Sequence, residues 1–140
     1  MNSKINYPAV VVSGIVYWLL QAGWYTALSG PWSEGIGKTK EQIMQQGGDS
    51  PVPYIVALVC NIVLAAVLAW AIGATGEFTV IRGLSVALVL WLGFVATTIG
   101  TNYVFERRSL TLFAINTGCP LLGMMIMAVI LGLWRKKAAA

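Results

Sequence analysis

Four long apolar stretches, none with a charged side chain, constrain the fold of this chain more than any other feature. They cover residues 8–28, 54–73, 84–105 and 111–134. A helix of about 20 residues crosses the roughly 30 Å hydrocarbon core of a bilayer, so each stretch is long enough. The sequence therefore predicts an all-α membrane protein, an antiparallel four-transmembrane-helix bundle that forms one domain over residues 1–137. Residues 138–140, three alanines, are interpreted as a vector-derived remnant.

The composition argues against an enzyme. Hydrophobic residues make up 58% of the chain and charged residues only 10%, against roughly 25% charged in an ordinary soluble domain. Histidine is absent, which removes the commonest metal ligand and the usual general base near neutral pH. All five acidic residues lie outside the apolar stretches, and Cys60 and Cys119 lie inside them without a charged neighbour. We therefore expect no catalytic residue, no metal and no cofactor.

Basic residues border the apolar stretches, although the net charge of +4 could also suggest nucleic-acid binding. The residues expected to anchor the helices at lipid head groups are Arg107, Arg108, Arg135, Lys136 and Lys137. This distribution indicates membrane lipids as partners and no nucleic acid. With four spans both termini share one side, which carries five basic residues against four on the other. The positive-inside rule then favours cytoplasmic termini in an inner (plasma) membrane.

The connections between the stretches differ in length. Residues 74–83 and 106–110 are short links, which make the second, third and fourth spans antiparallel neighbours. Residues 29–53 form the one long loop. Within it, Thr39 with Gln42 three residues later resembles a capping box. We expect this box to open a short interfacial helix that ends at Gly47.

Polar side chains inside the spans gather toward one membrane face. At 1.5 Å per residue they lie within roughly 5–11 Å of the face that bears the long loop. One interpretation is hydrogen bonding between helices, which contributes about 0.6–2 kcal/mol for each bond. The other is a one-sided polar cavity for a neutral or lipidic ligand or a partner helix. Its candidate residues are Gln21, Trp24, Tyr25, Asn61, Thr97, Thr98, Thr101, Asn102 and Asn116.

Small residues recur at every fourth position of the third span, at Gly93, Thr97 and Thr101. Such a stripe permits close approach of another helix. Within the bundle, the stripe is expected to pack on Gly14 and on Gly118 with Leu122 and Gly123. Between copies, it would produce a homo-oligomer that acts as a carrier or channel subunit. A structural accessory protein is the remaining alternative.

The last two spans carry a motif that resembles a known family. It runs through Gly93-Phe94-Val95-Ala96-Thr97-Thr98, Thr101-Asn102-Tyr103, Phe105-Glu106-Arg107-Arg108 and Ile115-Asn116-x-Gly118. Together with Gly23-Trp24-Tyr25, it is similar to the signature of domain-of-unknown-function family 1761. The resemblance covers nearly the whole chain and implies a small bacterial or fungal integral membrane protein without assigned activity. Where the resemblance predicts an aromatic residue and a histidine after Gly118, this chain has Cys119 and Pro120.

Overall fold

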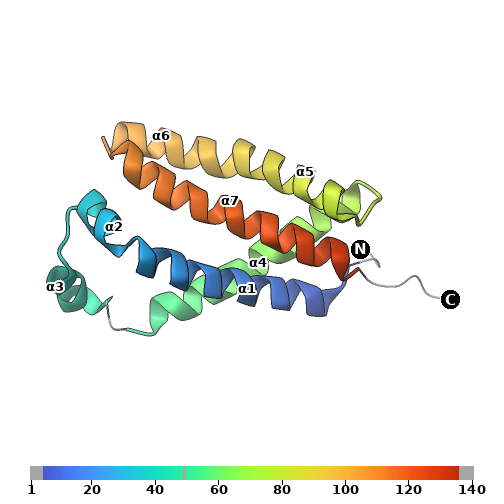
Figure 1. Ribbon diagram of the computed structural model, residues 1–140, viewed down its shortest axis with the longest axis horizontal. Helices are drawn as coiled ribbons and strands as arrows, with labels where there is room; N and C mark the ends of the chain where they lie inside the picture. Colours follow the sequence, from blue (N-terminus) through green and yellow to red (C-terminus); the bar gives the residue numbers. More distant parts are fainter. Residues whose placement is uncertain (1–4, 49, 136–140) are drawn as a thin grey trace.

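Four helical spans form the bundle in the computed structural model, which describes residues 5–48 and 50–135. All four are long and apolar enough to cross a membrane. They are α1 (Tyr7–Ala27), α4 (Val52–Ala74), the third span Val80–Phe105 and α7 (Leu110–Leu133) (Figure 1). The third span consists of α5 (Val80–Leu90), a π-helical segment η2 (Trp91–Ala96) and α6 (Thr97–Phe105). No strand occurs among the described residues. The prediction of a helical bundle is confirmed.

Side-chain caps fix where three of the spans begin. Asn6, Thr79 and Ser109 each accept a hydrogen bond from the backbone amide three residues later, at 3.3, 3.1 and 3.1 Å. Such N-caps satisfy amides that lack a partner in the first turn. The third span therefore begins at Val80, four residues before its predicted start, and Arg82 belongs to its first turn.

Glycines allow α1 to approach both α4 and α7 closely. A Cβ on Gly14 would lie 2.7 Å from Ile62 Cγ1 and 2.9 Å from Ile62 Cα, so α1 and α4 are in backbone contact there. Gly123 of α7 faces the ring of Tyr17, which is almost fully buried. Gly93 contacts nothing within 4 Å of its Cβ position. The expectation that the stripe at Gly93 packs onto Gly14, Gly118 and Gly123 is wrong. Those positions are occupied by Ile62, Trp24 and Tyr17, respectively.

The long loop contains two short helices, α2 (Ser29–Ile36) and α3 (Lys40–Ile43), followed by the turn Met44–Gly48. The capping box of Thr39 and Gln42 is confirmed, with bonds of 2.9 and 3.2 Å in its two directions. Helix α2 was not predicted. Its Gly35 lies against Leu112, so α2 is held beside the first turns of α7.

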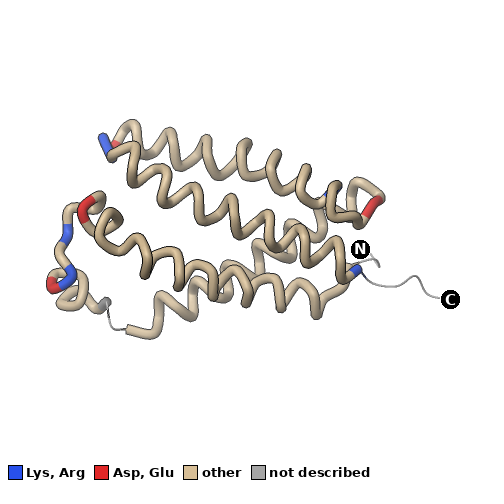
Figure 2. The backbone as a smooth tube through the Cα atoms, in the orientation of Figure 1, with Lys and Arg blue, Asp and Glu red and all other residues tan. Residues whose placement is uncertain are grey.

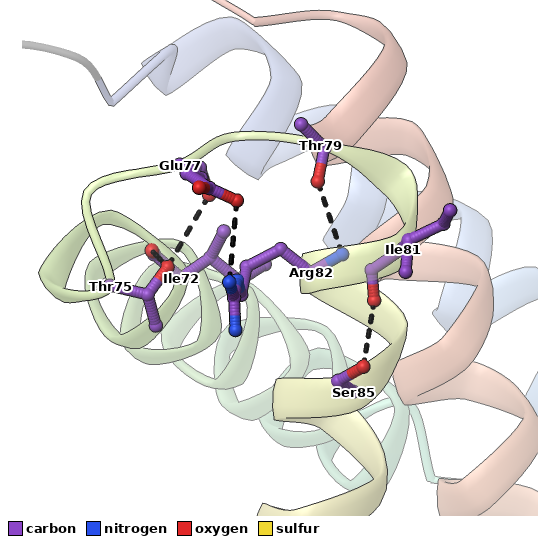
Figure 3. Close-up of polar contacts among 7 residues, drawn as sticks. All are labelled: Ile72, Thr75, Glu77, Thr79, Ile81, Arg82 and Ser85. Atoms are coloured by element: carbon purple, nitrogen blue, oxygen red, sulfur yellow. Dashed lines mark hydrogen bonds and ion pairs between the residues drawn. The ribbon is translucent and has the colours of Figure 1, made fainter.

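Charged residues lie at the two ends of the bundle and nowhere between them along the described spans (Figure 2). The end with α2, α3 and the turn from Glu106 to Ser109 is called the loop-bearing end below. At the opposite end, Arg82 and Glu77 form an exposed ion pair of 3.4 Å beside the cap of Thr79 (Figure 3). This distribution fits an integral membrane protein with two polar ends.

Candidate functional site

Two of the predicted amides pair with one another. Asn61 Nδ2 of α4 donates to Gln21 Oε1 of α1 at 2.7 Å. Asn61 is buried and Gln21 is half-buried. Burying an amide inside a bilayer costs free energy unless the amide is hydrogen-bonded. The Gln21–Asn61 hydrogen bond therefore links α1 to α4.

A second polar cluster joins three helices. Tyr25 of α1 donates its hydroxyl hydrogen to Asn116 Oδ1 of α7 at 2.9 Å, and Asn116 Nδ2 donates to the Tyr103 hydroxyl of α6. Trp24 Nε1 donates to the carbonyl of Ile115 at 3.1 Å. Tyr103 was missing from the candidate residues. Its depth was the available signal, because it lies near the end of the third span, at the level of Asn116.

The four candidate residues of the third span belong to neither of these two clusters. Thr97, Thr98, Thr101 and Asn102 are all exposed on the outside of the bundle. Thr97 and Thr101 donate back to the carbonyls of Gly93 and Thr97 in their own helix, at 2.7 and 2.9 Å. The nine candidate residues thus form two bonded clusters and one outer face, and do not surround one common cavity. Their role in ligand binding stays a prediction.

A cavity of about 560 Å³ opens at the loop-bearing end, between α2 and the turn that joins α6 to α7. Two arginines, two glutamates, a serine and a threonine are among the residues of its wall. The lining residues are Pro31, Glu34, Gly35, Glu106, Arg107, Arg108, Ser109 and Thr111. Sequence reasoning placed Arg107 and Arg108 at the membrane edge but did not predict a cavity there.

The turn beneath this cavity has an uncommon backbone. The amide of Arg107 donates to the carbonyl of Val104 at 3.2 Å, and that of Arg108 to Tyr103 at 2.9 Å. This pair of bonds is a Schellman motif, in which glycine usually takes the left-handed position. Here Arg107 takes it, with φ of +57°. An arginine in this conformation costs roughly 1–2 kcal/mol in stability relative to glycine.

Within the described chain, only two of the four charged residues that line the cavity form an ion pair. Arg108 Nε lies 2.6 Å from Glu106 Oε2, and its guanidinium lies 5.8 Å from the centre of the Tyr103 ring. The hydrogen bond that Arg108 donates to the Glu106 carboxylate raises the pKa of Arg108 above its usual value. Arg107 and Glu34 line the same cavity, yet neither forms an ion pair within the described part of the chain. Among the described residues, one arginine and one glutamate thus line the cavity without an ion-pair partner.

The other predicted anchoring residues lie at the opposite end or outside the described residues. Arg135 is exposed after the end of α7. Lys136 and Lys137 lie outside the described residues. Within residues 5–48 and 50–135, no group of three or more His, Cys, Asp or Glu side chains is arranged to hold a metal ion.

A family model described as a protein of unknown function, DUF1761, matches residues 8–132. The chain belongs to the DUF1761 family. The match includes all or nearly all of each span, together with α2 and the turn at Arg107. This confirms the resemblance found in the third and fourth spans. No curated protein and no solved structure matches the chain significantly.

Proposed function

We propose that this DUF1761 protein is a non-enzymatic membrane protein that binds a phospholipid at its loop-bearing end. The observation that carries the proposal is a charged cavity at the end of a bundle whose described spans have almost no charge. A lipid head group is the ligand available at that depth of a membrane, and basic side chains there attract its phosphate.

The surroundings of the cavity suit an amphiphile. Phe105 and Leu110 adjoin the lining residues in sequence and are 84% and 80% exposed. Exposed apolar side chains of this size contact lipid chains when the spans lie in a bilayer. A head group in the cavity would therefore leave its acyl chains beside an apolar surface.

The polar clusters within the spans are less suited to a ligand. Asn61 bonds to Gln21, and Asn116 bonds to both Tyr25 and Tyr103. A neutral ligand would have to replace these bonds without a net gain. We therefore assign both clusters to the stability of the bundle and the binding role to the cavity.

Localisation in an inner membrane with cytoplasmic termini completes the proposal, since the basic residues slightly favour the terminal side. The loop-bearing end would then face away from the cytoplasm. Membrane lipids are the proposed partners, and nucleic acid is not, because the basic residues of the described chain lie at the two ends of the bundle (Figure 2).

A homo-oligomeric carrier or channel subunit is the second candidate. The observation in its favour is that Gly93, Thr97 and Thr101 face outward, with open space at the Gly93 Cβ position. A second copy could approach this stripe closely. The mass of the detergent-solubilised protein tests it: a dimer or larger species supports this role, and a strict monomer excludes it.

Filling the cavity tests the lipid-binding proposal. Thr111→Trp places a large side chain at its wall, and the control Ile81→Trp changes an exposed residue at the opposite end, where Ile81 is 79% exposed. Native mass spectrometry from lipid nanodiscs should show that bound phospholipid is lost from Thr111→Trp and kept by Ile81→Trp. Equal lipid retention by both variants would leave a purely structural accessory role.

A further inference from the structure

We propose that the cavity selects a zwitterionic head group with a primary ammonium, the phosphoethanolamine of a phospholipid. This inference rests on the proposed function and specifies its ligand. It is carried by two opposite charges, Arg107 and Glu34, which line one cavity without pairing with each other.

The phosphate half of the head group belongs beside Arg107. A guanidinium binds phosphate oxygens through several donors. The lining also includes Ser109 and Thr111 at the N-terminus of α7, a helix of 24 residues whose dipole favours an anion. Ser109 already caps the amide of Leu112. The first-turn amide of Thr111, another lining residue, is therefore left for the ligand.

The ammonium half belongs beside Glu34. This carboxylate comes from α2, which packs on α7 through Gly35 and Leu112. Glu106, the other lining carboxylate, is already bonded to Arg108 at 2.6 Å. A primary ammonium donates three hydrogen bonds, so it can satisfy Glu34 directly.

The balance of charge in the wall gives the selectivity. Two arginines against two glutamates leave no net charge among the lining residues. A singly anionic head group such as phosphoglycerol would satisfy Arg107 but leave Glu34 without a cation. Phosphocholine carries the right charges, but its quaternary ammonium has no hydrogen to donate to Glu34. Phosphoethanolamine is the head group that matches both charges and supplies the hydrogen bonds.

The chain offers a matched control at the opposite end of the bundle. Arg82 and Glu77 are also an exposed arginine and glutamate at a membrane edge, but they pair with each other at 3.4 Å (Figure 3). A general effect of charge on lipid association should appear at both ends. Specific recognition should appear only at Arg107 and Glu34.

The experiment is native mass spectrometry of the full chain from nanodiscs with equal amounts of phosphatidylethanolamine, phosphatidylglycerol and phosphatidylcholine. The wild type should retain phosphatidylethanolamine in preference to the other two lipids. Glu34→Gln should lower the ratio of retained phosphatidylethanolamine to retained phosphatidylcholine roughly two- to fivefold, which is the effect of losing one partly exposed charge pair. Arg107→Gln should lower the retention of all three lipids. Arg82→Gln and Glu77→Gln should leave the ratios unchanged.

A second variant keeps the test independent of folding. Arg107→Gly removes the charge and also suits the left-handed backbone of the turn, so it should fold at least as well as the wild type. It should still lose lipid to the same extent as Arg107→Gln. Full retention of phosphatidylethanolamine by Arg107→Gly would overturn the assignment.

Two further outcomes separate this inference from the proposed function. If Thr111→Trp abolishes lipid retention while the wild type shows no preference among the three lipids, head-group selection is wrong and lipid binding stands. If Thr111→Trp changes nothing, both are wrong. Free phosphoethanolamine, added as a competitor, should displace the lipid only weakly, because it lacks the acyl chains. Displacement at equal concentration would identify a soluble zwitterion as the ligand and overturn the lipid assignment.

Discussion

Replacing Gly14 with alanine should destabilise the bundle, although alanine is the better helix former. The added Cβ would lie 2.7 Å from Ile62 Cγ1, 2.9 Å from Ile62 Cα and 3.0 Å from Ile62 N. Two of these atoms are backbone, so a change of side-chain rotamer cannot relieve the contact, and α1 and α4 must move apart.

The magnitude follows from two opposing effects. Overpacking in a well-packed core costs about 1–3 kcal/mol. Alanine in place of glycine within a helix returns about 0.5–1 kcal/mol. The free energy of unfolding of Gly14→Ala should therefore fall by about 1 kcal/mol, and by no more than about 2.5 kcal/mol. Reversible unfolding in mixed micelles, followed by circular dichroism or tryptophan fluorescence, measures it.

Gly93→Ala is the matched control, because no atom lies within 4 Å of the Gly93 Cβ position. It should leave stability unchanged or raise it by the helix-propensity difference alone. The reverse order, with Gly93→Ala destabilising and Gly14→Ala neutral, would refute the packing described above. It would favour the bundle in which the stripe at Gly93 lies inside.

Three further changes test other parts of the structure. Ser13→Ala should raise the midpoint of thermal unfolding, since the Ser13 hydroxyl is buried with no hydrogen-bond partner among the described residues. Removing an unsatisfied buried hydroxyl stabilises the folded state by about 1 kcal/mol. A lower midpoint would show that the hydroxyl has a partner. Arg107→Gly should stabilise the protein by up to about 1–2 kcal/mol by relieving the left-handed arginine, and a destabilised variant in the same chemical unfolding assay would contradict the turn geometry. Asn116→Leu should lower the free energy of unfolding by about 1–2 kcal/mol, because it removes the bonds to both Tyr25 and Tyr103. A double-mutant cycle with Tyr25→Phe should show an interaction energy between the two sites. Strictly additive effects would contradict the bond between Tyr25 and Asn116.

The spans could be predicted from the sequence because hydrophobicity along a helix is a local property. Their observed ends lie within two residues of the predicted ones, except at Val80, where the cap of Thr79 extends the third span. The capping box at Thr39 and Gln42 could also be predicted from the sequence, because its two residues lie within one helical turn.

Which side of the third span points into the bundle could not be predicted in the same way. Lipid is as apolar as the bundle core, so the pattern of apolar residues does not mark an inner face. The π-helical segment Trp91–Ala96 also shifts the register between α5 and α6. As a result, Thr97 and Thr101 point outward, while Tyr103 turns toward Asn116.

The cavity depends on a contact between distant parts of the chain. Depth along the spans correctly placed Gln21 level with Asn61, and these two pair in the structure. Nothing local to residues 29–36 indicates that α2 packs on Leu112 of α7. Without that contact Glu34 and Arg107 would not share a cavity, so the site emerges only from the folded chain.

The most direct test of the lipid-binding account is a crystal structure of the protein grown in a lipidic mesophase that contains phosphatidylethanolamine. We predict density for a phosphate beside the Arg107 guanidinium and for an ammonium beside the Glu34 carboxylate, with the acyl chains near Phe105 and Leu110. A direct ion pair between Arg107 and Glu34, or a cavity filled only with water, would contradict the account.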